Sequence, residues 1–237
     1  MSTDGNRTIL LLLSLAMLQV ASVALADEAA TTQSDAEVLR LTDAIVSRYE
    51  SFGAFSMDFV QTSYWSLADS AFVTEGSLHV ERPNHIAVSY ANGGRIVILG
   101  DSLRAYTPAT KQFYVAGIDT ASSVIDPARL LRAYRPEASD PLRAAGDDPR
   151  FGPETARGLL DLSLRPHDRL SEPSRLVVRV DPRTNRVRSI LAISSGNDWT
   201  RYDIVAERVV PTHPSGTFEL LRPEGAEAVT AMPFGGF

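Results

Sequence analysis

The chain has 237 residues, a formal net charge of −6, 44% hydrophobic residues and no cysteine. A mildly acidic surface disfavours nucleic acid and anionic lipid headgroups as partners. Without cysteine there is no disulfide, no thiolate zinc site and no lipid attached through a cysteine. The length and composition are those of a single globular domain with a sizeable core.

The first 26 residues predict a secretory signal peptide. Arg7 supplies a positive charge, residues 9–25 form a mostly apolar run, and Ala-Leu-Ala at residues 24–26 offers a cleavage site. The alternative is an uncleaved membrane anchor, but the run is short for a membrane span and is interrupted by polar residues. We therefore expect cleavage before Asp27, which leaves residues 27–237 as one soluble, monomeric domain.

An amphipathic helix is predicted from Ser34 to about Tyr49. Ser34 and Glu37 have the spacing of a capping box, in which two side chains satisfy backbone N–H groups of the first turn. Apolar residues then recur at spacings of three and four and so share one face. This face packs on a sheet or covers the mouth of a β-structure, and the pattern is compatible with both. Its residues are Val38, Leu41, Ile45, Tyr49 and Phe52.

From residue 54 the hydrophobic period changes to two, which is typical of β-strands. Residues 54–65 and 71–81 predict a pair of strands, with Phe55, Met57 and Phe59 on one face of the first. Apolar runs separated by short groups of Gly, Asn, Asp and Pro follow, and these groups predict turns. The meander extends to Pro108 and is followed by a strand at 112–116; the turn groups lie at residues 82–84, 92–94 and 100–102.

Within the meander, large apolar residues alternate with small ones. Ile86, Val88 and Tyr90 lie two residues apart and therefore face one side of their strand. Val97 and Leu99 likewise share one side of the next strand. We expect these side chains to form one continuous apolar concavity.

A segment of different character occupies residues 118–158. Ser123 or Asp126 can cap a short helix, and Pro127 suits its first turn. A stretch rich in Pro, Asp, Ala and Gly follows at residues 136–153, as expected for a lid, a binding loop or an irregular excursion. The apolar patch of the short helix is Leu130, Leu131 and Tyr134.

The rest of the chain again predicts strands separated by turns. Residues 181–185 and 195–198 have the composition of hairpin turns. The predicted strands lie at residues 158–165, 175–180, 187–194, 200–207 and 216–221. About eleven mostly antiparallel strands with helices in two places indicate an open, strongly curved β-sheet, or an incomplete barrel, with a helical lid.

The polar residues form no recognised catalytic or metal-binding motif. No two histidines have the spacing of zinc ligands, and the sequence has no nucleophile elbow, P-loop or dinucleotide-binding motif. We expect no enzymatic activity, no metal and no cofactor; the alternative is a hydrolytic site without a recognisable motif. The four histidines are His79, His85, His167 and His213.

Short motifs occur in a fixed order over roughly residues 35–230. Arg-Pro-Asn at residues 82–84 precedes the alternating strand, Ile-Val-Ile-Leu-Gly-Asp follows at 96–101, and Tyr-x-Pro follows at 106–108. Together with supporting matches, this set resembles the LolA family of periplasmic lipoprotein carriers. The supporting matches are Phe59-x-Gln61, Val180-Asp181-x-x-Thr184-x-x-Val187, and Phe-Glu-Leu-Leu-Arg-Pro-Glu-Gly at 218–225.

The resemblance implies a periplasmic carrier that moves lipoproteins from the inner to the outer membrane. Its partners would be the acyl chains of lipoproteins, an inner-membrane ABC transporter and an outer-membrane acceptor. An acyl chain needs shielding because each methylene exposed to water costs about 0.8 kcal/mol. The alternative is a periplasmic sensor of lipid or mislocalised lipoprotein with the same fold.

The resemblance also implies site residues. The carriers have an arginine before the proline of the strand-end motif, and it hydrogen-bonds backbone carbonyls of the lid in the closed form; Arg82 occupies that position. A guanidinium has five donors in a rigid fork and can hold several carbonyls. The alternative is an exposed arginine at a strand end. The residues expected to line the cavity are Met57, Phe59, Ile86, Val88, Tyr90, Val97, Leu99, Tyr106, Leu130 and Leu131.

Overall fold

The structure is a computed structural model. The predicted signal peptide, its cleavage site, Ser34 and Ser123 lie outside the residues that it describes. The chain forms two compact units, Met1–Arg40 and Leu41–Phe237. The described residues are 36–117, 126–137, 141–145, 148–151, 158–167 and 173–230.

A helix over residues 36–50 crosses the boundary between the two units. Within the second unit its apolar residues Leu41, Ile45 and Tyr49 are buried. Their spacing of four places them on one face of the helix. The predicted amphipathic helix is therefore confirmed over this part.

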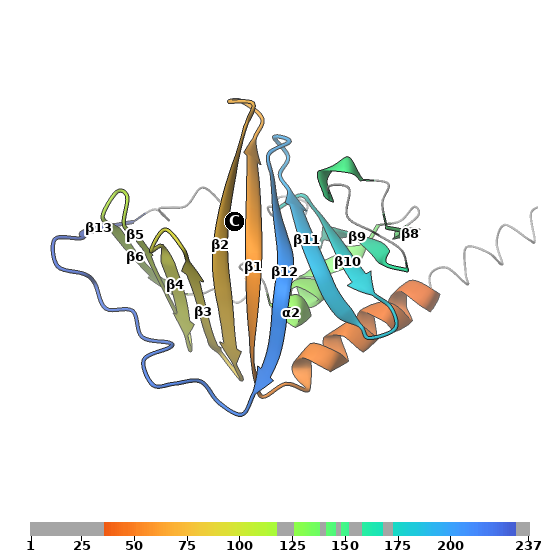
Figure 1. Ribbon diagram of the computed structural model, residues 1–237, viewed down its shortest axis with the longest axis horizontal. Coiled ribbons are helices and arrows are strands. Elements are labelled where there is room, and N and C mark those ends of the chain that lie inside the picture. The colour runs from red at the N-terminus through yellow and green to blue at the C-terminus, as the bar shows by residue number, and fades with distance from the viewer. Residues whose placement is uncertain are drawn as a thin grey trace, which may run out of the picture. The chain divides into compact units, whose positions relative to one another are not determined.

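The second unit contains one large β-sheet. Thirteen strands of the described residues join it, in the order β13-β6-β5-β4-β3-β2-β1-β12-β11-β10-β9-β7, with β8 also beside β9. Figure 1 shows a curved, fanned sheet with long β1 and β2 at its centre. The strands are β1 (Ala54–Trp65), β2 (Ser70–Glu81), β3 (His85–Tyr90), β4 (Arg95–Leu99), β5 (Ser102–Thr107), β6 (Gln112–Gly117), β7 (Tyr134–Pro136), β8 (Leu142–Ala144), β9 (Leu160–Pro166), β10 (Arg175–Asp181), β11 (Arg186–Ile193), β12 (Trp199–Val210) and β13 (Glu227–Val229).

The sheet is open and almost entirely antiparallel. Strands β13 and β7, at the two ends of the order, do not pair with each other among the described residues. Only β13, which pairs with β6, is parallel to its neighbour in this sheet as described. The predicted fold class, an open curved antiparallel sheet with few helices, is confirmed. Besides the helix at residues 36–50, the described helices are α2 (Pro127–Ala133) and the 3-10 turn Pro149–Phe151.

Local turn chemistry correctly located most strand ends. Asn185 and Asn197 adopt positive φ angles of 53° and 65° in the two predicted hairpin turns, and asparagine tolerates this region better than most residues. The predicted strand at residues 216–221 is wrong. Gly216 has a φ of 83°, and successive turns form where Pro214 O accepts from Thr217 N and Gly216 O accepts from Glu219 N.

The two faces of the sheet differ in what covers them. We call the face that bears Phe55, Met57 and Phe59 of β1 the inner face, and the opposite one the outer face. Directly opposite residues of antiparallel strands share a face. The inner face therefore continues through three more strands, and all of these side chains are buried; they are Leu78 and Val80 on β2, Ile86 and Val88 on β3, and Ile96 and Ile98 on β4.

The outer face carries two smaller apolar clusters. Phe151 of the 3-10 turn packs with Val177, Leu191 and Ile193 of β10 and β11. On the same outer face, toward the β13 end of the strand order, residues 218–226 supply side chains to a second cluster. Its members are Ala87, Val97, Phe113, Leu220 and Ala226, with Tyr106 and Phe218 packed against them.

Candidate functional site

Several of the predicted cavity residues lie on the inner face. Met57, Phe59, Ile86 and Val88 all face this side and are at most 2% exposed. Tyr90 shares their face, and its ring packs edge-to-face against Phe59 with 5.9 Å between ring centroids. The structure thus brings five of the predicted cavity residues together.

Three other predicted cavity residues lie on the opposite side of the sheet. Val97 stands directly opposite Ala87, so it points to the outer face. Tyr106 packs against the outer cluster that contains Val97, and Leu99 is 46% exposed. The prediction that Val97, Leu99 and Tyr106 share a concavity with Ile86 is therefore wrong. The register of β3 with β4 places Ile96 and Ile98 there instead.

The end of the helix at residues 36–50 lies over the inner face. The Tyr49 hydroxyl donates to Glu207 Oε2 at 2.7 Å, and Glu207 stands opposite Met57 across β12 and β1. Arg48 contributes a second bond to the Glu207 carboxylate at 2.6 Å. Burial, with the neighbouring Glu207 carboxylate, raises the pKa of the Tyr49 hydroxyl, which therefore stays protonated as a donor at neutral pH.

Helix α2 begins at Asp126, which caps the helix and also pairs with Arg82. Asp126 is the N-cap, and its Oδ1 accepts a hydrogen bond from Ala128 N at 3.1 Å, while Pro127 occupies the first turn. The prediction of this cap and this proline is confirmed. Leu130 and Leu131 of the helix are buried, as expected for the apolar side of a lid. The helix is short and leads directly into β7.

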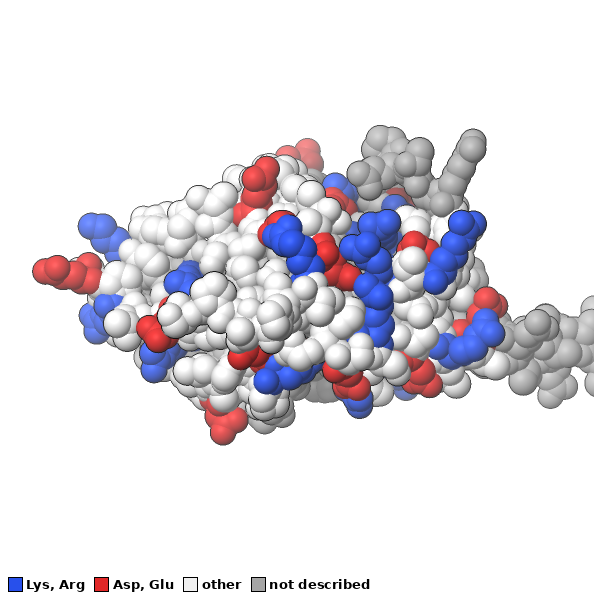
Figure 2. Space-filling model, turned by 60° about the horizontal axis from the view of Figure 1, so that its bottom comes forward, with Lys and Arg blue, Asp and Glu red and all other residues white. Residues whose placement is uncertain are grey.

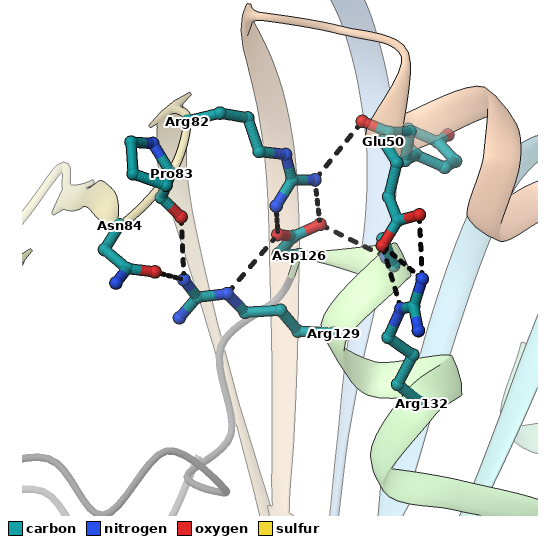
Figure 3. Close-up of polar contacts among 9 residues, drawn as sticks. Glu50, Arg82, Pro83, Asn84, Asp126, Arg129 and Arg132 are labelled. Carbon is teal, nitrogen blue, oxygen red and sulfur yellow. Dashed lines mark hydrogen bonds and ion pairs between the residues drawn. The ribbon is translucent and has the colours of Figure 1, made fainter.

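Arg82 joins the end of β2 to both helices. Its Nη1 donates to Asp126 Oδ2 at 2.8 Å, and its Nη2 donates to Asp126 Oδ1 at 3.3 Å and to Tyr49 O at 3.2 Å. Figure 3 shows this two-pronged contact between guanidinium and carboxylate. The Asp126 side chain is fully buried. The latch is thus an ion pair to the cap of α2 plus one carbonyl of the other helix, rather than a set of lid carbonyls.

Two arginines of α2 itself add further contacts between this helix and the rest of the chain. Arg129 Nη2 donates to Asn84 Oδ1 at 2.6 Å and to Pro83 O at 3.1 Å, in the turn that follows β2. Arg132 makes a two-pronged ion pair with Glu50, with both bonds at 2.8 Å. Hydrogen bonding from Arg132 lowers the pKa of the Glu50 carboxyl. We call these contacts, with the Arg82–Asp126 pair, the lid clamp (Figure 3).

The sequence singled out Arg82 and, as a possible cap, Asp126, but it did not single out Arg129 and Arg132. Asp126, Arg129 and Arg132 recur every third residue, so they share one side of a short helix. That spacing was a usable signal for a charged helix face that meets a complementary surface. The partners Glu50 and Asn84 carry no such signal, because only the folded chain brings them beside α2.

The surface around the site mixes both signs of charge. In the view of Figure 2, basic and acidic side chains lie beside one another in several groups, separated by uncharged surface. No described helix is long and apolar enough to span a membrane. Within the described part of the chain, no group of three or more histidine and acidic side chains is arranged to hold a metal ion.

Comparisons with known proteins find likeness at the level of the fold. An uncharacterized conserved protein from Thermus thermophilus is 11% identical, with a TM-score of 0.45, over 84% of this chain and 99% of that one. The LolA superfamily protein NE2245 from Nitrosomonas europaea is 10% identical, with a TM-score of 0.41, over 76% and 97%. MucB, in a Pseudomonas aeruginosa MucA/MucB complex, is 14% identical, with a TM-score of 0.41, over 76% and 61%.

The sequence matches no protein-family model, and no curated protein matches it significantly. The solved structures are therefore similar to this chain in fold alone. The open, curved antiparallel sheet is the fold that the sequence resemblance to LolA-like carriers predicts.

Proposed function

We propose that this protein is a periplasmic carrier, without enzymatic activity, that shields the acyl chains of lipoproteins on its inner face. It would receive them from an inner-membrane ABC transporter and pass them to an outer-membrane acceptor. One observation supports the proposal: a buried apolar face spans at least four strands, and the short helix α2 is attached to the end of β2 through polar contacts.

The nature of these contacts suits reversible opening. If apolar packing alone held the lid, the ligand would merely replace the apolar contacts of the lid with its own. Opening would then gain no free energy. The two hydrogen bonds of the buried Arg82–Asp126 pair would oppose opening by about 3–6 kcal/mol in total, at about 1.5–3 kcal/mol for each charge-assisted bond. An acyl chain of twelve methylenes gains roughly 10 kcal/mol on leaving water, which is enough to open the lid and leaves affinity moderate.

The buried Arg82–Asp126 pair is the contact that should set this balance. Removing Arg82 removes the opposition to opening, so cargo should remain bound for longer. We expect Arg82→Leu to load acylated peptide at least as well as the unaltered protein and to transfer it more slowly to acceptor membranes. The matched control is Arg132→Leu, which removes an exposed ion pair from the same helix.

The outcomes separate the alternatives. Normal transfer by Arg82→Leu would refute the latch and leave the Arg82–Asp126 pair with a structural role alone. Binding of acylated peptide by the unaltered protein without any transfer would favour a sensor over a carrier. Failure of the unaltered protein to bind any acylated peptide would refute acyl shielding altogether.

A further inference from the structure

The inner face changes character along β1. Beyond Phe59 its next residues are Gln61 and Ser63, which stand directly opposite Tyr202 and Thr200 of β12. These side chains are polar but uncharged. The inner face therefore has an apolar end under the helices and a neutral polar end beyond Phe59.

Two polar groups at this end have no hydrogen-bond partner among the described residues. Tyr202 is 3% exposed, its ring packs edge-to-face against Phe59 at 5.6 Å, and its hydroxyl makes no hydrogen bond with the described residues. Gln61 Oε1 is also buried without a partner there. The amide nitrogen of Gln61 donates to Ser63 Oγ at 2.9 Å, which leaves the oxygen as the vacant acceptor.

Burial without a hydrogen bond is costly for a hydroxyl or an amide oxygen, so such groups usually signal a missing partner. Burial raises the pKa of the Tyr202 hydroxyl, which keeps it a donor at neutral pH. Gln61 and Tyr202 are cross-strand neighbours, so one donor and one acceptor await a ligand on the same face.

We propose that Tyr202 and Gln61 bind the secondary amide that joins an acyl chain to the rest of the ligand. The amide carbonyl accepts from the Tyr202 hydroxyl, and the amide N–H donates to Gln61 Oε1. The acyl chain then extends over Phe59 toward Met57 and Val88. This inference rests on the proposed function, because it names the group that such a carrier recognises.

The uncharged residues beside Gln61 and Tyr202 favour an amide over a carboxylate or a phosphate. The inner-face residues level with Gln61 and Ser63 on the neighbouring strands are Thr74, Phe72, Tyr202 and Thr200, and none can neutralise a carboxylate or phosphate. A buried anion without a counter-charge is strongly disfavoured. An ester has the carbonyl but no N–H, so it would leave Gln61 Oε1 unpaired.

The test uses two ligands that differ by one group, N-methyldodecanamide and methyl dodecanoate. Their binding to the full chain is measured by displacement of an apolar fluorescent probe, below the concentrations at which they aggregate. We expect the amide to bind about two- to tenfold more tightly than the ester, the range of one net hydrogen bond. Tyr202→Phe should weaken both ligands by a similar factor, and Gln61→Leu should weaken the amide alone.

Stability provides a second measurement. Tyr202→Phe removes a buried hydroxyl without a partner, so the free variant should unfold at the same or a higher urea concentration than the unaltered protein. The matched control is Tyr64→Phe, because Tyr64 bonds Asp69 and lies on the outer side of β1, where it stacks on Trp199. This control should leave both affinities unchanged.

The two proposals fail in different ways. Equal affinity of amide and ester, or unchanged affinities in a folded Tyr202→Phe variant, would overturn the linkage site while acyl binding stands. Absence of binding by either ligand to the unaltered protein would overturn acyl shielding and the linkage site with it.

Discussion

Gly76 shows how one residue shapes the inner face. It stands directly opposite Phe59 on β1 and Tyr90 on β3. A Cβ atom there would lie 2.4 Å from Phe59 Cζ and 2.9 Å from Ser89 O. Glycine therefore makes room for the edge-to-face contact of the two rings.

Gly76→Ala should consequently destabilise the protein by about 1–3 kcal/mol, the usual range for overpacking in a core. Urea unfolding measures the change. Gly53→Ala is the control, because a Cβ at Gly53 would meet nothing within 4 Å. Phe59→Leu should cost less in the Gly76→Ala background than alone; strict additivity would show that the ring does not require the glycine.

The Arg82–Asp126 and Arg132–Glu50 ion pairs of the lid clamp differ in burial, and so they should differ in coupling. A double-mutant cycle with Arg82→Leu and Asp126→Asn should give a coupling of about 1.5–3 kcal/mol, because the carboxylate is buried and Asn retains the cap. The same cycle for Arg132 and Glu50, both exposed, should give a coupling within the error of the measurement. Equal couplings would contradict the assignment of the latch to Arg82.

At the scale of elements, the strands and turns were more predictable than their pairing. A period of two and turns rich in Asn, Gly and Pro are local signals, and they located β1 to β6 and the hairpins at Asn185 and Asn197. Which of two alternating sets shares a face with the neighbouring strand depends on register. The β3–β4 turn sets that register, where Tyr90 O accepts from Gly93 N, and it places Ile96 rather than Val97 on the inner face.

The segment that follows β12 packs on the outer face, where its His213 lies against His79 of β2. His79 of β2 and His213 have ring centroids 5.2 Å apart, and His213 Nε2 bonds the carbonyls of Phe55 and Val80. Burial, followed by the proximity of His213, lowers the pKa of His79 below its usual 6.5, although Asp58 opposes this effect. At a pH between the lowered pKa and the usual one, His79 is therefore neutral in the folded protein but protonated in the unfolded chain.

The sign of the pH dependence follows from this shift. The unfolded state binds more protons, so the contribution of His79 to stability is complete above about pH 6.5 and is lost as pH falls through the lowered pKa. We expect the free energy of unfolding to decrease between about pH 7 and pH 5. His79→Gln should flatten this part of the profile; an unchanged slope would show that other groups cause it.

For the molecule as a whole, the sequence predicted an open sheet with a helical lid, because a long series of strands contains only short helical interruptions. It did not predict how the helices attach to the sheet. That depends on contacts between residues far apart in the chain, such as Tyr49 with Glu207 and Arg82 with Asp126. The apolar face and its latch are thus properties of the fold rather than of any local motif.

The central claim is that acyl chains lie on the inner face. It is tested most directly by an acylated peptide with a photoreactive diazirine near the end of its acyl chain, cross-linked to the full chain and mapped by fragmentation mass spectrometry. We predict labelling at Met57, Val88 and Ile96 of the sheet and at Leu131 of α2. Labelling confined to Val97, Phe113 and Leu220 of the outer cluster would contradict the account.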